Sequence, residues 1–177
     1  VVELRFDYLP AINMDEIKGL VKLLNVPYII TVRRRDQGGL FSGAEQERFE
    51  LLVNLIKLKP AYLDIEADVD PAVIERLHNA SPTTQLIASV HNFKKTPDDL
   101  EAVLNNMQHP AISIYKMVTQ ANNSIDALRM MAWVKRVTKQ CHVVGHCMGE
   151  AGQITRITGP FVGNYFVYAA MDAQSEV

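Results

Sequence analysis

The stretch ISIYKMVTQ, residues 112–120, has the composition of a buried β-strand but carries a lysine at its centre. Ile112, Ile114 and Tyr115 are residues that interior strands favour. An ammonium group buried without a partner is costly, so Lys116 is either a strand-end lysine whose head reaches water or a functional amine. The type of sheet to which this strand belongs bears directly on that choice.

Runs of similar composition recur along the chain, and helical patterns separate them. Strands alternating with helices predict a parallel sheet covered by helices, in one domain spanning residues 1–177. Both an open doubly wound sheet and a closed (β/α)8 barrel fit this order. The predicted strands are 1–6, 27–33, 61–67, 85–93, 111–117, 141–148 and 164–171.

Capping residues mark the starts of several predicted helices. Asn13 with Glu16 and Ser42 with Glu45 have the spacing of a capping box, in which each side chain bonds the other's backbone. Asp70, followed directly by a proline, predicts an N-cap and a first helical residue.

Polar residues gather at the carboxyl ends of the predicted strands, and this favours the barrel. In a (β/α)8 barrel every strand delivers its C-terminal end to one shared mouth, whereas an open sheet concentrates such residues near one switch point. We therefore predict an α/β fold of the TIM-barrel class, lacking the first strand and the last helix and so incomplete at both ends. The strand-end residues are Glu3, Arg5, Asp7, Arg33, Asp64, Glu66, Ser89, His91, Lys116, His146 and Met148.

Composition argues against several classes of partner. The chain has 48% apolar and 21% charged residues and a net charge of −2, which gives no reason to expect nucleic acid or an anionic membrane as a partner. No apolar run reaches the roughly 18 residues of a membrane span, and no signal peptide is visible. Two cysteines fit a reducing compartment, so we expect a cytoplasmic protein.

A shared mouth favours the functional interpretation of Lys116. Burial and neighbouring cations such as Arg33 and Arg156 favour the neutral amine, which forms imines with ketones and aldehydes. His91, one predicted strand earlier, is then a candidate general acid/base. Arginine forks suit a substrate carboxylate.

A metal site is not expected in the CHVVGHC stretch, residues 141–147. On a strand its two histidines face one side and its two cysteines the other, so they cannot converge on one ion. We therefore predict no metal and no cofactor.

The motifs, taken in order, resemble the type I 3-dehydroquinate dehydratases of the shikimate pathway over nearly the whole chain. The SVHNFKKTP block is the most specific of these motifs, and the YKMVTQ segment stands where the family has its Schiff-base lysine. The matching segments are ELRFDYL (3–9), TVRRRDQGG (31–39), YLDIE (62–66), SVHNFKKTP (89–97), YKMVTQ (115–120) and MGEAGQITRI (148–157).

The resemblance implies a carbon–oxygen lyase that converts 3-dehydroquinate to 3-dehydroshikimate without a cofactor. It implies that Lys116 forms the imine and that His91 transfers protons as general acid/base. The implied substrate contacts are Arg156 to the carboxylate, Glu3, Arg5 and Arg33 to hydroxyls, Met148 to the ring and Ser175 from a closing loop. A homodimer and a fused shikimate dehydrogenase domain are partners that the resemblance leaves open.

Two departures from the family pattern stand out. Gln37 replaces the glutamate that many members have before Gly-Gly, and a glutamine stabilises a charged histidine less well. The family's loop also continues to Pro-Gly-Gln, whereas this sequence stops at Val177. Two alternatives remain at this level: a class I aldolase on the same barrel, which would share the lysine, and a ligand-binding barrel that has lost catalysis, which only Gln37 favours.

Overall fold

The computed structural model describes residues 1–169, which form two compact units. Unit 1 comprises residues 1–89 and 107–113, and unit 2 comprises residues 90–106 and the chain from residue 114 onward. Two of the boundaries fall inside strands β4 (Gln85–Asn92) and β5 (Ile112–Gln120), not in linkers.

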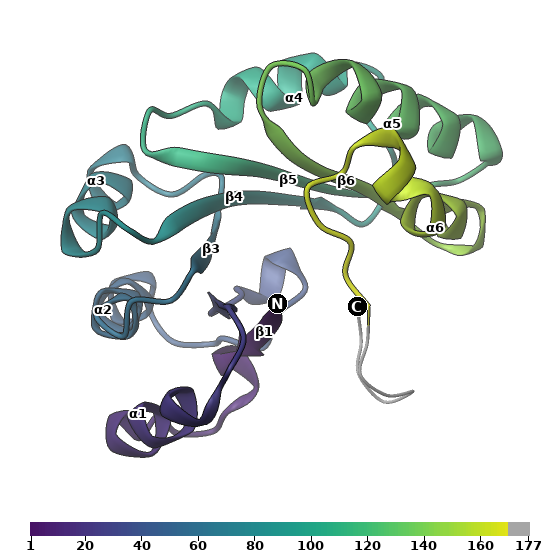
Figure 1. The fold of residues 1–177 in the computed structure, drawn as a ribbon. Helices are drawn as coiled ribbons and strands as arrows, with labels where there is room; N and C mark the ends of the chain where they lie inside the picture. Colours follow the sequence, from purple (N-terminus) through teal and green to yellow (C-terminus); the bar gives the residue numbers. More distant parts are fainter. Residues whose placement is uncertain (170–177) are drawn as a thin grey trace. The chain divides into compact units, whose positions relative to one another are not determined.

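Unit 1 consists of strands paired in parallel with a helix after each of the first three. Buried side chains such as Ile30, Leu52 and Leu63 form its core. Figure 1 shows α1, α2 and α3 following one another along one side of these strands. The elements are β1 (Val2–Arg5), η1 (Phe6–Tyr8), α1 (Met14–Leu23), β2 (Tyr28–Thr31), η2 (Arg35–Gln37), α2 (Glu45–Ile56), β3 (Tyr62–Glu66), α3 (Pro71–Ala80) and the first part of β4.

The strand register of unit 1 aligns its polar residues in rows. Arg5 of β1 pairs with Thr31 of β2, and Thr31 pairs with Asp64 of β3. Two residues further along β3 and β4, Glu66 pairs with Ser89. Since paired residues of a parallel sheet point to the same face, these side chains share one face of the strands.

Unit 2 contains the rest of β4 and most of β5, followed by β6 and helices on one side of the strands (Figure 1). Gly145 of β6 faces α5, where an added Cβ would lie only 2.6 Å from Val134 and 3.0 Å from the Trp133 ring. The elements after β4 are α4 (Leu100–Met107), β5, α5 (Ser124–Val137), β6 (His142–Met148), η3 (Glu150–Gly152) and α6 (Gln153–Val162).

The face of β6 that points away from α5 carries candidate site residues. Lys116 of β5 pairs with Val144 of β6, and Val118 pairs with His146. Because the side chains of a strand alternate between its faces, His146 points away from the α5 side that Gly145 occupies.

Two of the three predicted helix starts are confirmed. The Asn13 side chain accepts hydrogen bonds from the backbone of Asp15 and Glu16, and Asp70 caps the backbone N–H of Ala72. The prediction for Ser42 is wrong: helix α2 begins two residues later than expected, with Ala44 as N-cap.

The start of α2 is stabilised in a different way from the one expected. The Ala44 backbone N–H donates to the Glu47 carboxylate at 3.0 Å. Alanine cannot accept a bond in return, so only one half of a capping box forms.

The predicted seventh strand, 164–171, is wrong for the residues that the structure describes, because 164–169 carry no strand. The Asn164 side chain takes the place of a ladder: Gly145 N–H donates to its Oδ1 at 2.7 Å, and its Nδ2 donates to Gly145 O at 2.9 Å. One backbone bond follows, from Tyr165 N to Val143 O at 2.8 Å. A side-chain amide thus imitates the pairing that a strand would have made.

The chain therefore has a mixed α/β fold with parallel strand pairs, as the alternating pattern predicted. The closed eight-stranded barrel stays a prediction. Within residues 1–169, none of the helices combines the length and the apolar composition that crossing a membrane requires.

Candidate functional site

Arg33 of unit 1 is buried and held by two acidic side chains. Its Nη2 lies 2.6 Å from Asp64 Oδ1 and its Nη1 lies 3.4 Å from Glu66 Oε1. Burial alone lowers the pKa of a guanidinium, but the two carboxylates outweigh this and raise the pKa of Arg33 above its ordinary value. The Ser89 hydroxyl donates to the same Asp64 oxygen at 2.6 Å, which further fixes that carboxylate.

A second buried arginine binds the same glutamate. Arg48 of α2 is fully buried and donates to Glu66 Oε2 at 2.6 Å and to Val32 O at 3.1 Å. Its Nε and Nη2 atoms donate to the two carboxylate oxygens of Glu45, at 2.9 and 2.6 Å. Glu66 therefore bridges Arg48 and Arg33, and neither of its oxygens is left without a donor.

Arg5 forms a bidentate pair with Asp7. The Arg5 Nε and Nη2 atoms lie 2.9 and 2.7 Å from the two Asp7 oxygens. Burial opposes charge on Asp7, but the bonds from Arg5 and from the Leu40 N–H outweigh it and lower the pKa of this carboxyl. Nearby, Glu3 Oε1 accepts a bond from the Thr31 hydroxyl at 2.7 Å.

Gln37 lies in the η2 turn, directly before a pair of glycines. Gly38 has φ +81°, a left-handed conformation that favours glycine. A Cβ on Gly39 would lie 2.1 Å from the carbonyl oxygen of Arg33, so only glycine lets this loop return against β2. Gln37 is half-buried in the turn that the glycines create.

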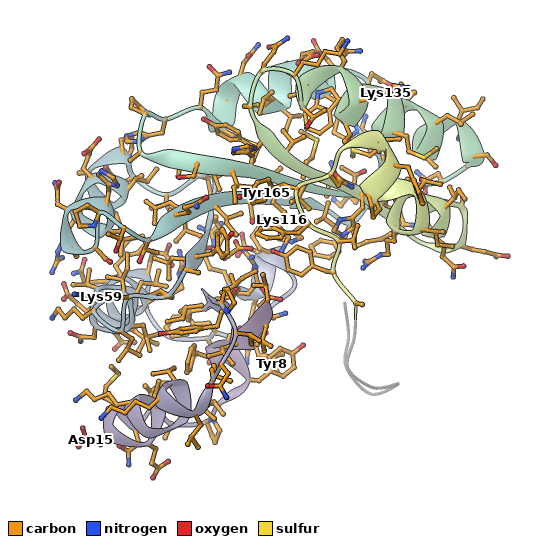
Figure 2. The ribbon with its side chains drawn as sticks, viewed as in Figure 1. Tyr8, Asp15, Lys59, Lys116, Lys135 and Tyr165 are labelled. Carbon is orange, nitrogen blue, oxygen red and sulfur yellow. The ribbon has the colours of Figure 1, made fainter. Side chains whose placement is uncertain are left out.

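Lys116 is buried in β5 with its amine against an aromatic ring. Only 6% of the residue is exposed, and Nζ lies 4.0 Å from the centre of the Tyr168 ring. Figure 2 shows Lys116 on the side of β5 away from α4 and α5. The buried position excludes the simple interpretation of a surface lysine at a strand end.

His146 lies one strand from Lys116 and is kept neutral. Burial, with help from the positive charges of Arg156 and Lys116, lowers the pKa of His146 from 6.5 to about 3. Its ring centre lies 6.4 Å from that of Tyr168. At neutral pH this side chain therefore contributes a polar but uncharged group beside the lysine.

Arg156 of α6 is joined to the same aromatic residue. Its Nη1 donates to the Tyr168 carbonyl oxygen at 3.4 Å, and burial lowers the pKa of this guanidinium. The structure thus brings Lys116, His146, Arg156 and Tyr168 together in unit 2. Met148 ends β6 two residues after His146 and is half-buried.

His91, also in unit 2, lies near the end of β4, with its ring stacked on Phe93 at a centroid distance of 6.1 Å. The chain turns directly afterwards, where the Asn92 side chain accepts bonds from the backbone N–H groups of Lys94 and Lys95 at 3.0 Å each. The Thr96 hydroxyl then donates to the carbonyl of Gln120 at 3.0 Å. The HNFKKT sequence therefore places the histidine on the strand and ties the following loop to the end of β5.

The remaining predictions concern metals and the closing loop. Within the described residues, no cluster of three or more His, Cys, Asp or Glu side chains is arranged to hold a metal ion. Ser175 lies outside the described residues, so its role stays a prediction.

Sequence reasoning missed Tyr168 as a site residue. It was placed in a predicted strand, where an aromatic residue is ordinary. Its position depends on the Asn164 amide and on the carbonyl contact with Arg156, and neither leaves a periodic signal in sequence. The neutral state of His146 was equally hidden, because it depends on burial beside two cations.

Comparison with known proteins identifies relatives over the whole chain. A family model described as type I 3-dehydroquinase matches residues 1–177. The chain is 32% identical to the 3-dehydroquinate dehydratase of Desulfotalea psychrophila, an alignment that covers 97% of this chain and 77% of that protein. It is also 29% identical to a bifunctional 3-dehydroquinate dehydratase/shikimate dehydrogenase of Arabidopsis thaliana, covering 98% of this chain and 29% of that protein.

A solved structure confirms the type of fold. The crystal structure of a type I 3-dehydroquinate dehydratase from Clostridium difficile matches with a TM-score of 0.86 at 23% identity. The match covers 98% of this chain and 74% of that one. At this level of identity the likeness concerns the fold alone.

Proposed function

Because the chain belongs to the type I 3-dehydroquinase family, we propose that it dehydrates 3-dehydroquinate to 3-dehydroshikimate through an imine on Lys116. The observation that supports this most directly is the burial of Lys116 in β5, with Nζ beside a polar but neutral imidazole and an aromatic ring. Covalent catalysis on a ketone requires an amine, and a lysine held in a buried site can supply it.

The proposed reaction has three stages: formation of an imine, elimination through an enamine, and hydrolysis. The neutral amine of Lys116 adds to the substrate ketone, and the resulting carbinolamine accepts a proton from protonated His91 and loses water to give a protonated imine. His91 removes a proton from the adjacent carbon, and the electrons move into the imine to form an enamine. The enamine expels the β-hydroxyl, which leaves as water with the proton from His91. A second water then hydrolyses the imine and frees Lys116.

The substrate contacts follow from the family motifs together with the local charges. Arg156, which contacts Tyr168 as Lys116 does, has the planar fork that suits the substrate carboxylate. Arg5 and Arg33 already pair with acidic side chains, so neutral hydroxyls suit them better than a further carboxylate. Glu3 is assigned to a hydroxyl, Met148 to the carbon ring and Ser175 to the closed state on the motifs alone.

Borohydride trapping tests the covalent step. Incubation of the protein with 3-dehydroquinate and sodium borohydride should add the mass of one reduced substrate- or product-derived ligand to the peptide containing Lys116. Peptide mass spectrometry locates the adduct. A protein that dehydrates the substrate without any adduct, or with one on another lysine, would contradict the mechanism.

Variants separate the role of the lysine from general effects of substitution. Lys116→Met should lower kcat by at least about a thousandfold, because the covalent route is lost, while ligand binding persists. Lys135→Met is the matched control, since Lys135 is exposed on α5 (Figure 2), and it should keep full activity. Similar activity of the two variants would exclude Lys116 as the nucleophile.

The histidine assignment has its own signature. His91→Ala should lower kcat by roughly 10²- to 10⁴-fold and let the covalent intermediate accumulate, because imine hydrolysis also needs a proton carrier. The amount of borohydride adduct at steady state measures this accumulation. Normal turnover by the variant would remove His91 from the mechanism.

A further inference from the structure

The Tyr168 ring faces the one atom that carries the covalent chemistry proposed above. Lys116 Nζ lies 4.0 Å from the ring centre, well inside the range in which a cation is attracted to the negative face of an aromatic ring. The same nitrogen becomes the imine nitrogen, so the ring remains next to the charge after the substrate has attached.

The immediate surroundings of this nitrogen are buried and contain further basic side chains. Lys116 is buried, and His146 on the neighbouring strand has its pKa lowered to about 3, partly by the charges of Arg156 and Lys116 themselves. Burial near another cation disfavours the protonated form of an imine. A neutral imine withdraws electrons poorly, so a loss of the proton would halt carbon–hydrogen cleavage.

We propose that Tyr168 is a catalytic residue whose ring face keeps the Lys116 imine protonated, and hence electron-withdrawing, in a buried site rich in cations. The inference rests on the proposed imine mechanism and assigns to the aromatic residue a function beyond packing. It requires the ring itself and not the phenol hydroxyl, because the attraction comes from the π-system.

The local structure anchors the segment that carries the ring at two points. The Tyr168 carbonyl accepts a hydrogen bond from Arg156, and four residues earlier the Asn164 amide is bonded to both backbone groups of Gly145. The ring therefore stands over Nζ on a segment anchored to β6 and to α6.

The test is the pH dependence of kcat, which reports protonation within the substrate complex. Position 168 is replaced by phenylalanine and then by phenylalanines carrying one, two and three ring fluorines, which progressively weaken the negative face at nearly constant shape. The alkaline limb of the kcat profile should move to lower pH in steps, by about one unit over the series, which is a tenfold change in the protonation equilibrium. The acidic limb should stay in place.

Two further variants check the geometry. Tyr168→Leu should shift the alkaline limb at least as far as the trifluorinated ring. Tyr165→Leu, the same change three residues earlier on a ring that lies 4.5 Å from His142, should leave the profile of the native protein unchanged. If Tyr168→Leu does not fold, the fluorinated series still decides the question, because those rings preserve the packing.

The outcomes separate this inference from the proposed function. If borohydride traps an adduct on Lys116 but the alkaline limb stays at the same pH throughout the series, the role of the ring is overturned. The imine mechanism then stays intact. Absence of any Lys116 adduct in the native protein overturns both. A stepwise shift together with trapping supports both.

Discussion

Replacing His146 with methionine should remove an acid sensitivity from the stability of the protein. In the folded protein the imidazole stays neutral down to a pH of about 3, whereas in the unfolded chain its pKa returns to the ordinary 6.5. Below pH 6.5, His146 binds a proton in the unfolded chain but not in the folded protein. The free energy of unfolding therefore falls as the pH decreases. The free energy of unfolding is unaffected by the titration of this residue above pH 6.5 and decreases progressively towards pH 3.

The size of the effect follows from the difference between the two pKa values. At about 1.4 kcal/mol per pH unit, the native protein should lose roughly 2 kcal/mol between pH 7.5 and 5.0 through this residue alone. At pH 3 the loss approaches about 5 kcal/mol as an upper bound. Methionine has a similar volume and does not titrate, so His146→Met should lack this component.

Urea unfolding at several pH values measures the difference. Trp133, the single tryptophan, is buried in α5 against β6, and its fluorescence reports directly on the unit that contains His146. The unfolding free energy should fall between pH 7.5 and 5.0 by about 2 kcal/mol more in the native protein than in His146→Met. All other titrating groups are common to both proteins and cancel.

A control on the same strand isolates burial as the cause. His142 begins β6 and is exposed, so His142→Met should retain the pH dependence of the native protein. Parallel pH curves for the native protein and His146→Met would refute the reasoning, because they would mean that the imidazole titrates normally in the folded state.

Three further substitutions probe packing and backbone geometry through the same unfolding measurement. Arg48→Met should cost about 3–5 kcal/mol, because it leaves the buried carboxylate of Glu66 without its closest partner, and removing both charges together should cost less than the sum. Lys59→Gly should stabilise the protein by roughly 0.5–1 kcal/mol, since Lys59 has φ +53° at the turn after α2; a loss of stability would contradict this. Gly145→Ala should cost about 1–3 kcal/mol, because the new methyl would lie 2.6 Å from Val134; an unchanged midpoint would show that α5 moves aside freely.

The sequence was most informative about local features, such as the element on which a residue lies. The alternation of strands and helices predicted the parallel pairing, and the lysine in residues 112–120 was correctly placed in a strand. Asn13 and Asp70 were recognised as caps because their role depends on spacing of two or three residues. Such features are local, so a single sequence contains them.

Features that depend on contacts between distant residues were not predictable. Ser42 had the spacing of a cap, but α2 begins at Glu45 and uses the carboxylate of Glu47 instead. The strand expected at 164–171 fits its apolar composition, yet the Asn164 amide replaces the ladder where it meets Gly145. A composition typical of strands cannot reveal that a side chain will satisfy the neighbouring backbone.

The Asn164 contact also means that the segment carrying Tyr168 can detach without breaking any strand pair. Its hydrogen bonds to β6 include two between the Asn164 side chain and Gly145 and one backbone bond from Tyr165, and its rings contact His142 and His146. Contacts outside a strand ladder can open locally at a lower cost than global unfolding. The amide hydrogen of Tyr165 should therefore exchange with solvent through local opening, well before those of β6. We therefore expect the aromatic ring beside Lys116 to lie on a segment that opens locally while the sheet stays intact.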